Sequence, residues 1–120
     1  MKPNNRKIGS RYEDLAAAYL SEAGYRILTR NYRNRFGEID IVAADSKGTL
    51  VFAEVKYRRQ DETAALEAVT PAKRRQISRI ALFYLNHTKA GTEYPCRFDV
   101  IGINGEGRIV HIENAFDFSQ

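Results

Sequence analysis

The sequence predicts a single α/β domain in which a central mixed β-sheet is flanked by helices. Two segments carry apolar residues at helical spacing, the segment 37–57 alternates as two strands do, and three further short segments are interpreted as strands. Their order is helix, strand, strand, strand, helix, strand, strand (α-β-β-β-α-β-β), which favours helices packed on a mixed sheet. With 120 residues, of which 43% are hydrophobic, the chain can bury one core, so residues 1–120 are expected to form one domain.

Composition excludes several classes of protein. No apolar run approaches the length of a membrane span, and the N-terminal segment is basic but lacks the apolar stretch of a secretory signal. Cys96 is the only cysteine, which excludes an internal disulfide and a cysteine-based zinc site and suits a reducing compartment. The net charge of +4 mildly favours binding to polyanions. We therefore expect a cytoplasmic protein that does not associate with membranes.

The first helix is expected to begin at Ser10, after a flexible basic arm formed by residues 1–9. Ser10 and Glu13 have the spacing of a capping box, in which each side chain accepts a hydrogen bond from the backbone N–H of the other residue. Apolar residues then form one stripe as far as Ala23, and Gly24 suits the left-handed residue that ends a helix. Glu13 therefore has two interpretations: a helix cap only, or an acid that reaches a site from the helix.

Residues 25–32 are expected to form the first strand, and arginines follow it. Arg33 and Arg35 are interleaved with Tyr32 and Phe36. Arginine combined with aromatic residues suits phosphate contact and base stacking. The same pattern is also typical of an ordinary solvated strand edge, so both interpretations stand.

The segment 37–57 predicts two strands joined by a tight turn. Apolar and polar residues alternate on both arms, and the turn between them has the chemistry of a three-residue hairpin loop. Counting back from this loop along both arms places Asp40 opposite Glu54 and Glu38 opposite Lys56. All four then lie on one face of the sheet, because side chains two residues apart in a strand point the same way.

Two carboxylates in this position suggest a metal site. Opposed residues have Cβ atoms about 4.5–5.5 Å apart, and like charges at that distance are destabilising. A divalent cation between Asp40 and Glu54 removes the repulsion, and the Val55 carbonyl adds an oxygen of the kind that hard cations bind. Lys56 would then be close enough to orient a water or to balance charge on a phosphate. The alternative is that these are paired, solvated charges on an exposed sheet face.

A second helix is expected to start at Thr70 and Pro71, as its cap and its first residue. Its first turn carries Lys73, Arg74 and Arg75, and positive charge there opposes the helix dipole. Either a bound anion neutralises this positive charge or the side chains are solvated. Solvation is a better interpretation of Arg74 and Arg75 than it is of Lys73.

Residues 96–103 and 108–113 are expected to form the last two strands, with Phe116 packed on the core beyond them. Asp99 is an acid within a strand, for which we expect a salt bridge or a turn role. Neither histidine has ligand partners at metal-binding spacing.

Four motifs, in this order, resemble the YraN-like family of small bacterial proteins of uncharacterised role. They are GEID at residues 37–40, FxEVKYR at 52–58, VTPxK at 69–73 and RFDV at 97–100. The resemblance covers nearly the whole chain. That family is similar in turn to the archaeal Holliday junction resolvases and to the PD-(D/E)xK nucleases, although Ile39 stands where the PD signature has its proline.

The resemblance implies a restriction-endonuclease-like core, a DNA substrate and Mg²⁺ or Mn²⁺ as the cofactor. It implies Glu13 as the helix-borne acid, Asp40 and Glu54 as metal ligands, and Lys56 as the catalytic lysine. The Val55 carbonyl is expected to complete the metal ligands. Contacts to the DNA backbone are expected from six basic residues, which are Arg33, Arg35, Arg58, Arg59, Lys73 and Arg74.

These features predict a metal-dependent DNA endonuclease that hydrolyses phosphodiester bonds, on branched DNA or on repair and recombination intermediates. The alternative is a nucleic-acid-binding module without catalysis in a repair or recombination complex. A third interpretation is a protein-interaction domain. Cutting of junctions would favour a two-fold homodimer.

Overall fold

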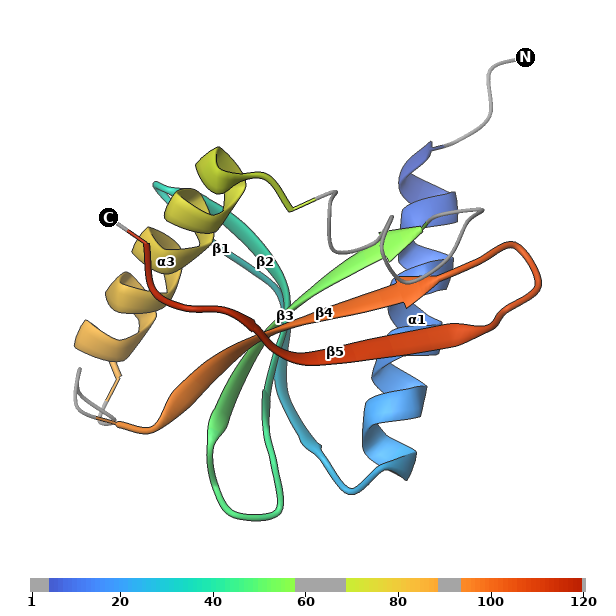
Figure 1. Ribbon diagram of the computed structural model, residues 1–120, viewed down its shortest axis with the longest axis horizontal. Coiled ribbons are helices and arrows are strands. Elements are labelled where there is room, and N and C mark those ends of the chain that lie inside the picture. Colours follow the sequence, from blue (N-terminus) through green and yellow to red (C-terminus); the bar gives the residue numbers. More distant parts are fainter. Residues whose placement is uncertain (1–4, 58–68, 89–93, 120) are drawn as a thin grey trace.

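A five-stranded β-sheet forms the centre of the molecule, with helices α1 and α3 on its two sides (Figure 1). The computed structural model describes residues 5–57, 69–88 and 94–119, with side chains described from Arg11 onward. The helices are α1 (Asn5–Glu22) and α3 (Pro71–Asn86). The strands are β1 (Arg26–Asn34), β2 (Gly37–Ala44), β3 (Leu50–Tyr57), β4 (Cys96–Ile103) and β5 (Ile109–Phe116).

The sheet is mixed, as predicted. Its spatial order follows the chain from β1 to β5. Strands β3 and β4 are parallel and every other neighbouring pair is antiparallel. The parallel pair needs a crossover connection, and α3 lies within it. The predicted order of helices and strands is therefore confirmed.

Each face of the sheet packs on one helix. Phe52 and Ala53 are neighbours in β3 but belong to different hydrophobic clusters, because successive side chains of a strand point to opposite faces. The cluster under α3 is centred on Phe52, Phe98, Ile77 and Ile80. The cluster under α1 contains Ala16, Leu20, Ile41, Ala43, Ala53, Ile101 and Ile103. In the described residues, neither helix combines the length and apolar character needed to cross a membrane.

The start of α3 agrees with the prediction. Thr70 is the cap, and its Oγ1 accepts a hydrogen bond of 3.2 Å from the N–H of Lys73. The core packing predicted for Phe116 is also confirmed: it is 8% exposed and stacks on Phe98 at a centroid distance of 4.9 Å. Strand β5 reaches Phe116 and so continues three residues past its predicted end at residue 113.

The start of α1 differs from the prediction. The helix begins at Asn5 instead of Ser10, so residues 5–9 of the expected flexible arm are helical, while residues 1–4 lie outside the described residues. Arg6, Lys7 and Ile8 are all compatible with a helix, and the cost of one glycine is only about 1 kcal/mol. Glu13 therefore lies in the interior of α1, and a capping box no longer accounts for it.

Candidate active site

The β2–β3 hairpin has the predicted register. Ile41 pairs with Ala53 and Ala43 pairs with Val51, and the turn closes with a 3.0 Å hydrogen bond from the Asp45 N–H to the Thr49 carbonyl. The regular pairing ends at Ile41 and Ala53, so the next residues in the predicted register, Asp40 and Glu54, stand at the point where the strands part.

At Asp40 a side chain replaces the backbone pairing. Asp40 Oδ2 accepts a hydrogen bond of 2.8 Å from the N–H of Val55, a donor that a regular ladder would bond to a carbonyl. The side chains of β2 also change faces here: Ile39 packs under α3, whereas Ile41 packs under α1. In a regular strand, residues two apart share a face. The distortion holds the Asp40 carboxylate in place and opens the sheet beside it.

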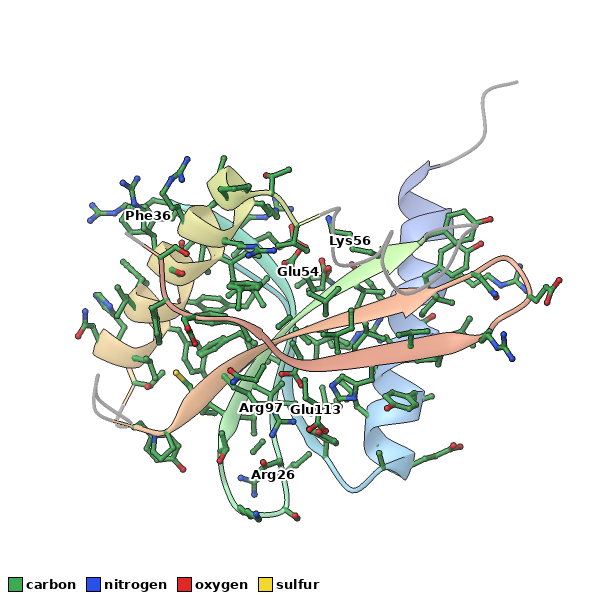
Figure 2. All side chains as sticks on the ribbon, viewed as in Figure 1. Arg26, Phe36, Glu54, Lys56, Arg97 and Glu113 are labelled. Atoms are coloured by element: carbon green, nitrogen blue, oxygen red, sulfur yellow. The ribbon has the colours of Figure 1, made fainter. Side chains whose placement is uncertain are left out.

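A pocket of about 340 Å³ occupies this opening. It is lined by α1, β2, β3 and the first turn of α3, so elements from both sides of the sheet contribute to it. Figure 2 shows Glu54 and Lys56 between the two helices. The charged side chains in the lining are four carboxylates and two lysines, which are Glu13, Glu38, Asp40, Glu54, Lys56 and Lys73.

Three of these carboxylates form a cluster. One oxygen from each of Glu13, Glu38 and Asp40 lies within 4.8 Å of the others. Asn31 of β1 lies across from Asp40 and has a left-handed φ of 54°. With its amide nitrogen turned toward the acids, it donates to Glu13 Oε2 at 3.1 Å and to Glu38 Oε1 at 2.8 Å. Asn31 thus connects the helix-borne acid to β2.

Glu38 is a candidate that the sequence-based site did not include. The signal for it was present, because its spacing of two residues from Asp40 predicts a shared face. In the structure its Oε2 also accepts a hydrogen bond of 2.6 Å from Arg33 Nη2, and the two side chains form an ion pair. Arg33 itself is exposed, so this pair links the acidic cluster to the solvent-facing surface of β1.

Glu54 lies outside that cluster but in the same pocket. Its side chain is nearly fully buried, and its Oε2 lies 3.9 Å from Lys56 Nζ and 4.0 Å from Lys73 Nζ. Its other oxygen, Oε1, is buried and has no hydrogen-bond partner among the described residues. A buried carboxylate oxygen without a partner is costly, because it has lost its hydration without compensation.

The electrostatics of the pocket favour an added positive charge. Burial and the neighbouring charge of Asp40 raise the pKa of Glu54 to about 8, and the same two causes raise the pKa of Glu13 to about 7. Burial also raises the pKa of Asp40, against the opposing effects of the Val55 N–H and Lys56. These carboxyl groups thus hold protons more tightly than free acids do, because burial and neighbouring negative charge disfavour their charged forms.

The residues present fit a divalent cation of the Mg²⁺ type. Carboxylates are the donors that hard cations prefer, and Glu54 Oε1 offers one that has no partner in the described part of the chain. Val55 lines the pocket and its N–H is bonded to Asp40. A role for the Val55 carbonyl stays a prediction, as do the assigned roles of Glu13, Asp40, Glu54 and Lys56.

The basic residues predicted to hold DNA are dispersed. Lys73 lines the pocket, and Arg33 lies at its margin through its pair with Glu38. The Arg35 guanidinium instead lies over the Phe36 ring, at 4.9 Å from the ring centroid. Arg58 and Arg59 lie outside the described residues.

Arg74 is engaged on the core side of α3. Its Nε donates a 3.0 Å hydrogen bond to the Val69 carbonyl, and its guanidinium lies 5.4 Å from the Phe116 ring centroid. The structure therefore does not bring Arg74 into the pocket with Lys73, although both belong to the first turn of the same helix.

The salt bridge expected for Asp99 is present, and it lies apart from the pocket. Asp99 is fully buried and pairs with Arg97 Nε at 3.0 Å and with His111 Nε2 at 2.7 Å. The Tyr19 hydroxyl bonds to the other ring nitrogen of His111 at 3.0 Å, which ties β4 and β5 to α1. This network has a structural role that accounts for Asp99.

These observations define a class: a small α/β protein with a carboxylate and lysine site where two central strands part. The particular family follows from its sequence. The chain belongs to the uncharacterised protein family UPF0102, whose family model matches residues 12–103. The YraN-like family predicted from the four motifs is thereby confirmed.

Relatives resemble the chain over nearly all of its length. It is 51% identical to a UPF0102 protein of Syntrophus aciditrophicus, over 96% of this chain and 92% of the relative. It is 50% identical to a UPF0102 protein of Geobacter sulfurreducens, over 97% of this chain and 93% of that protein.

Solved structures with a similar arrangement are larger proteins. A repair endonuclease from Pyrococcus abyssi is similar with a TM-score of 0.43 and 17% identity, over 89% of this chain and 41% of that chain. EndoMS in a complex with double-stranded DNA is similar with a TM-score of 0.41 and 20% identity, over 77% of this chain and 34% of that chain. The present chain thus spans about two fifths or less of these proteins.

Proposed function

We propose that this protein is a divalent-metal-dependent endonuclease that hydrolyses phosphodiester bonds in DNA. The observation that carries the proposal is Glu54: a buried carboxylate, one oxygen of which has no partner among the described residues, in a pocket shared with Asp40 and two lysines. A buried carboxyl oxygen without a partner is unfavourable for the fold, so a ligand is the better explanation. The resemblance of the motifs to those of DNA nucleases supports the choice of substrate.

The residues have distinct roles in this proposal. Asp40, fixed by the Val55 N–H, and Glu54 would hold the cation, and Glu13 and Glu38 line the same pocket with oxygens close to Asp40. Mg²⁺ or Mn²⁺ would stabilise charge on the phosphate and make a water nucleophilic at neutral pH. Lys56 and Lys73, both next to Glu54, place positive charge where charge develops on the phosphate.

Cleavage of labelled DNA tests the proposal. Single-stranded, duplex, flap and four-way-junction DNAs are incubated with the protein in Mg²⁺ and in Mn²⁺. We expect cutting of at least one DNA by the wild type and at least a 100-fold slower reaction with Glu54→Gln. The matched control is Glu106→Gln, the same change at an exposed turn residue. Equal cutting by the Glu54 variant, or no cutting of any DNA, would contradict the proposal.

Metal binding separates the nuclease from a binding module without catalysis. A cation that binds only the folded protein stabilises it, by about 2.7 kcal/mol when the free cation is at 100 times its Kd. We expect Mn²⁺ to raise the melting temperature of the wild type and to leave that of Asp40→Asn unchanged. A binding module would show salt-sensitive DNA binding in both proteins and no effect of Mn²⁺.

A further inference from the structure

A second pocket, of about 500 Å³, lies on the outer side of α3. We call it the α3 pocket and define it by Arg35 and Phe36, which follow β1, and by Arg79, Phe83 and His87 of α3 and its C-cap. Figure 2 shows Phe36 beside α3, on the side of the helix away from Glu54 and Lys56. The carboxylates proposed as metal ligands do not contribute to its lining.

The α3 pocket contains planar side chains that are already stacked. The His87 ring lies on the Phe83 ring with a centroid distance of 3.9 Å and an angle of 11°. His87 Nδ1 lies 2.9 Å from the Phe83 carbonyl oxygen, which fixes the plane of the imidazole. The Arg35 guanidinium covers Phe36 and also lies 6.0 Å from the Phe83 centroid. Arg35 and His87 are exposed, whereas the two phenylalanines beneath them are half-buried.

The charge of the α3 pocket is positive. Arg35 and Arg79 both line it, and no carboxylate does. Within residues 5–57, 69–88 and 94–119, neither arginine is in an ion pair with a carboxylate. Arg75 is exposed one turn before Arg79 on the same face of the helix and extends the positive surface toward the first turn of α3. The pocket is therefore complementary to a polyanion with planar groups.

The α3 pocket is held at a fixed position relative to the carboxylates. Gln76 Nε2 of α3 donates a 2.9 Å hydrogen bond to the Phe36 carbonyl, which ties the start of β2 to the helix. From Phe36 to Asp40 the chain rises over four strand residues, or about 13 Å. From Lys73 to Phe83 it rises over ten helical residues, or about 15 Å. Both estimates place the α3 pocket on the order of 13–15 Å from the carboxylates.

We propose that the α3 pocket binds unpaired nucleotides of a nucleic-acid strand. Bases stack on the guanidinium of Arg35 and the imidazole of His87, the two groups by which proteins commonly hold splayed bases besides larger aromatics. Arg79 contacts phosphate. The inference rests on the proposed function for its ligand, DNA, and adds that the substrate has a single-stranded segment. An acidic peptide would use the arginines but would not need the stacked rings.

Binding without cleavage tests the inference. Anisotropy of a fluorescent oligo-dT is measured in EDTA, so that no metal-dependent cutting occurs. We expect His87→Ala and Arg35→Ala each to weaken binding about tenfold, the equivalent of 1.4 kcal/mol. His87→Phe retains a ring and should bind as the wild type does. Arg26→Ala removes the same charge at the opposite end of β1 and is the control for net charge (Figure 2).

The form of the DNA provides a second readout. Bases of a duplex are already stacked on one another, so binding of a blunt duplex should be insensitive to His87→Ala. Equal weakening by Arg26→Ala and Arg35→Ala, or equal binding of oligo-dT by His87→Ala and the wild type, would overturn the inference. Tighter binding of a labelled polyglutamate peptide than of oligo-dT, abolished by Arg35→Ala, would also overturn the inference.

These results are distinguishable from failure of the proposed function. Glu106→Gln should bind oligo-dT as the wild type does, because Glu106 is exposed and lines neither pocket. Binding that depends on His87, in a protein that cuts no DNA, would refute the nuclease and retain the α3 pocket. Cutting that depends on Glu54, with binding that ignores His87 and Arg35, would refute the α3 pocket alone.

Discussion

Glu54 is the residue at which burial and charge conflict most strongly. In the absence of metal, its pKa in the folded protein is about 8, against an ordinary value of 4.5. The folded protein therefore holds a proton that the unfolded chain releases between these values. Stability falls as pH rises through this range, because the unfolded state then binds fewer protons.

Glu54→Gln should remove this pH dependence. In EDTA at pH 8.5 we expect the variant to be more stable than the wild type by about 2 kcal/mol, and at pH 5 we expect a much smaller difference. Urea unfolding at the two pH values measures the free energies, with Glu106→Gln as the control. A variant that is less stable than the wild type at pH 8.5 would show that Glu54 is satisfied within the fold.

Single residues also show what sequence could and could not predict about the site. Asp40, Glu54 and Lys56 were placed together because turn chemistry fixes the hairpin register and strand geometry then fixes the face. The contact of Glu13 with this group depends on the packing of α1 on the sheet, which spacing along one segment does not define. Asn31 was missed, because its role depends on a left-handed backbone conformation beside Asp40.

At the scale of elements, the start of β2 depends on a glycine. Gly37 has a φ of +135°, and a Cβ built on it would lie 2.5 Å from Gln76 Nε2. The residue thus allows both the backbone conformation and the close approach of α3. Alanine here would strain the backbone and displace the side chain that ties Phe36 to the helix.

Gly37→Ala should therefore lower the free energy of unfolding by more than backbone strain alone would. Gly107 also has a left-handed φ, of +81°, but a Cβ there would meet nothing within 4 Å, so Gly107→Ala is the matched control. We expect a loss of about 1 kcal/mol in the control and about 2–3 kcal/mol in Gly37→Ala. Equal losses in thermal or urea unfolding would mean that Gln76 moves aside without cost.

The pairing of β4, β5 and α1 depends on the Asp99 network. Burial alone would raise the pKa of Asp99, but hydrogen bonds from His111, Arg97 and the Asn114 N–H outweigh it and lower the pKa below its ordinary value. A carboxylate with a lowered pKa contributes stability at pH values above its ordinary pKa, and this contribution is lost as pH falls through the folded-state pKa.

Asp99→Asn should destabilise the protein by about 3 kcal/mol at pH 7, because it leaves a partly buried arginine short of a partner. The difference from the wild type should shrink below about pH 4, where the Asp99 carboxyl of the unfolded chain binds a proton that the folded protein does not yet bind. Asp117→Asn, the same change at an exposed residue, is the control. Unfolding curves at the two pH values check both statements, and an unchanged difference at low pH would contradict the linkage.

The elements themselves were largely predictable, and their ends were less so. The cap and proline at Thr70 and Pro71 fix the start of α3, and alternation fixes β2 and β3. The start of α1 was misplaced because Ser10 and Glu13 have capping-box spacing within a segment that is helical throughout. Local signals of this kind do not show whether a helix continues through them.

At the scale of the whole molecule, the candidate site lies where the two faces of the sheet meet. Glu13 reaches it from the helix on one face and Lys73 from the helix on the other. The α3 pocket depends in the same way on segments far apart in the chain, since it joins the residues after β1 to the second half of α3. Sequence periodicity assigns residues to faces but does not show which distant surfaces become neighbours.

The hydrogen bond from the Val55 N–H to Asp40 makes one backbone amide a built-in reporter of the site. Its proton resonance senses the charge on the carboxylate, so titration with Mg²⁺ should shift the Val55 amide signal more than that of Val51, which lies within the regular β2–β3 ladder. In Asp40→Ala the Val55 amide should exchange with solvent faster while the Val51 amide keeps its protection. Occupancy of the site can then be followed by NMR without any substrate.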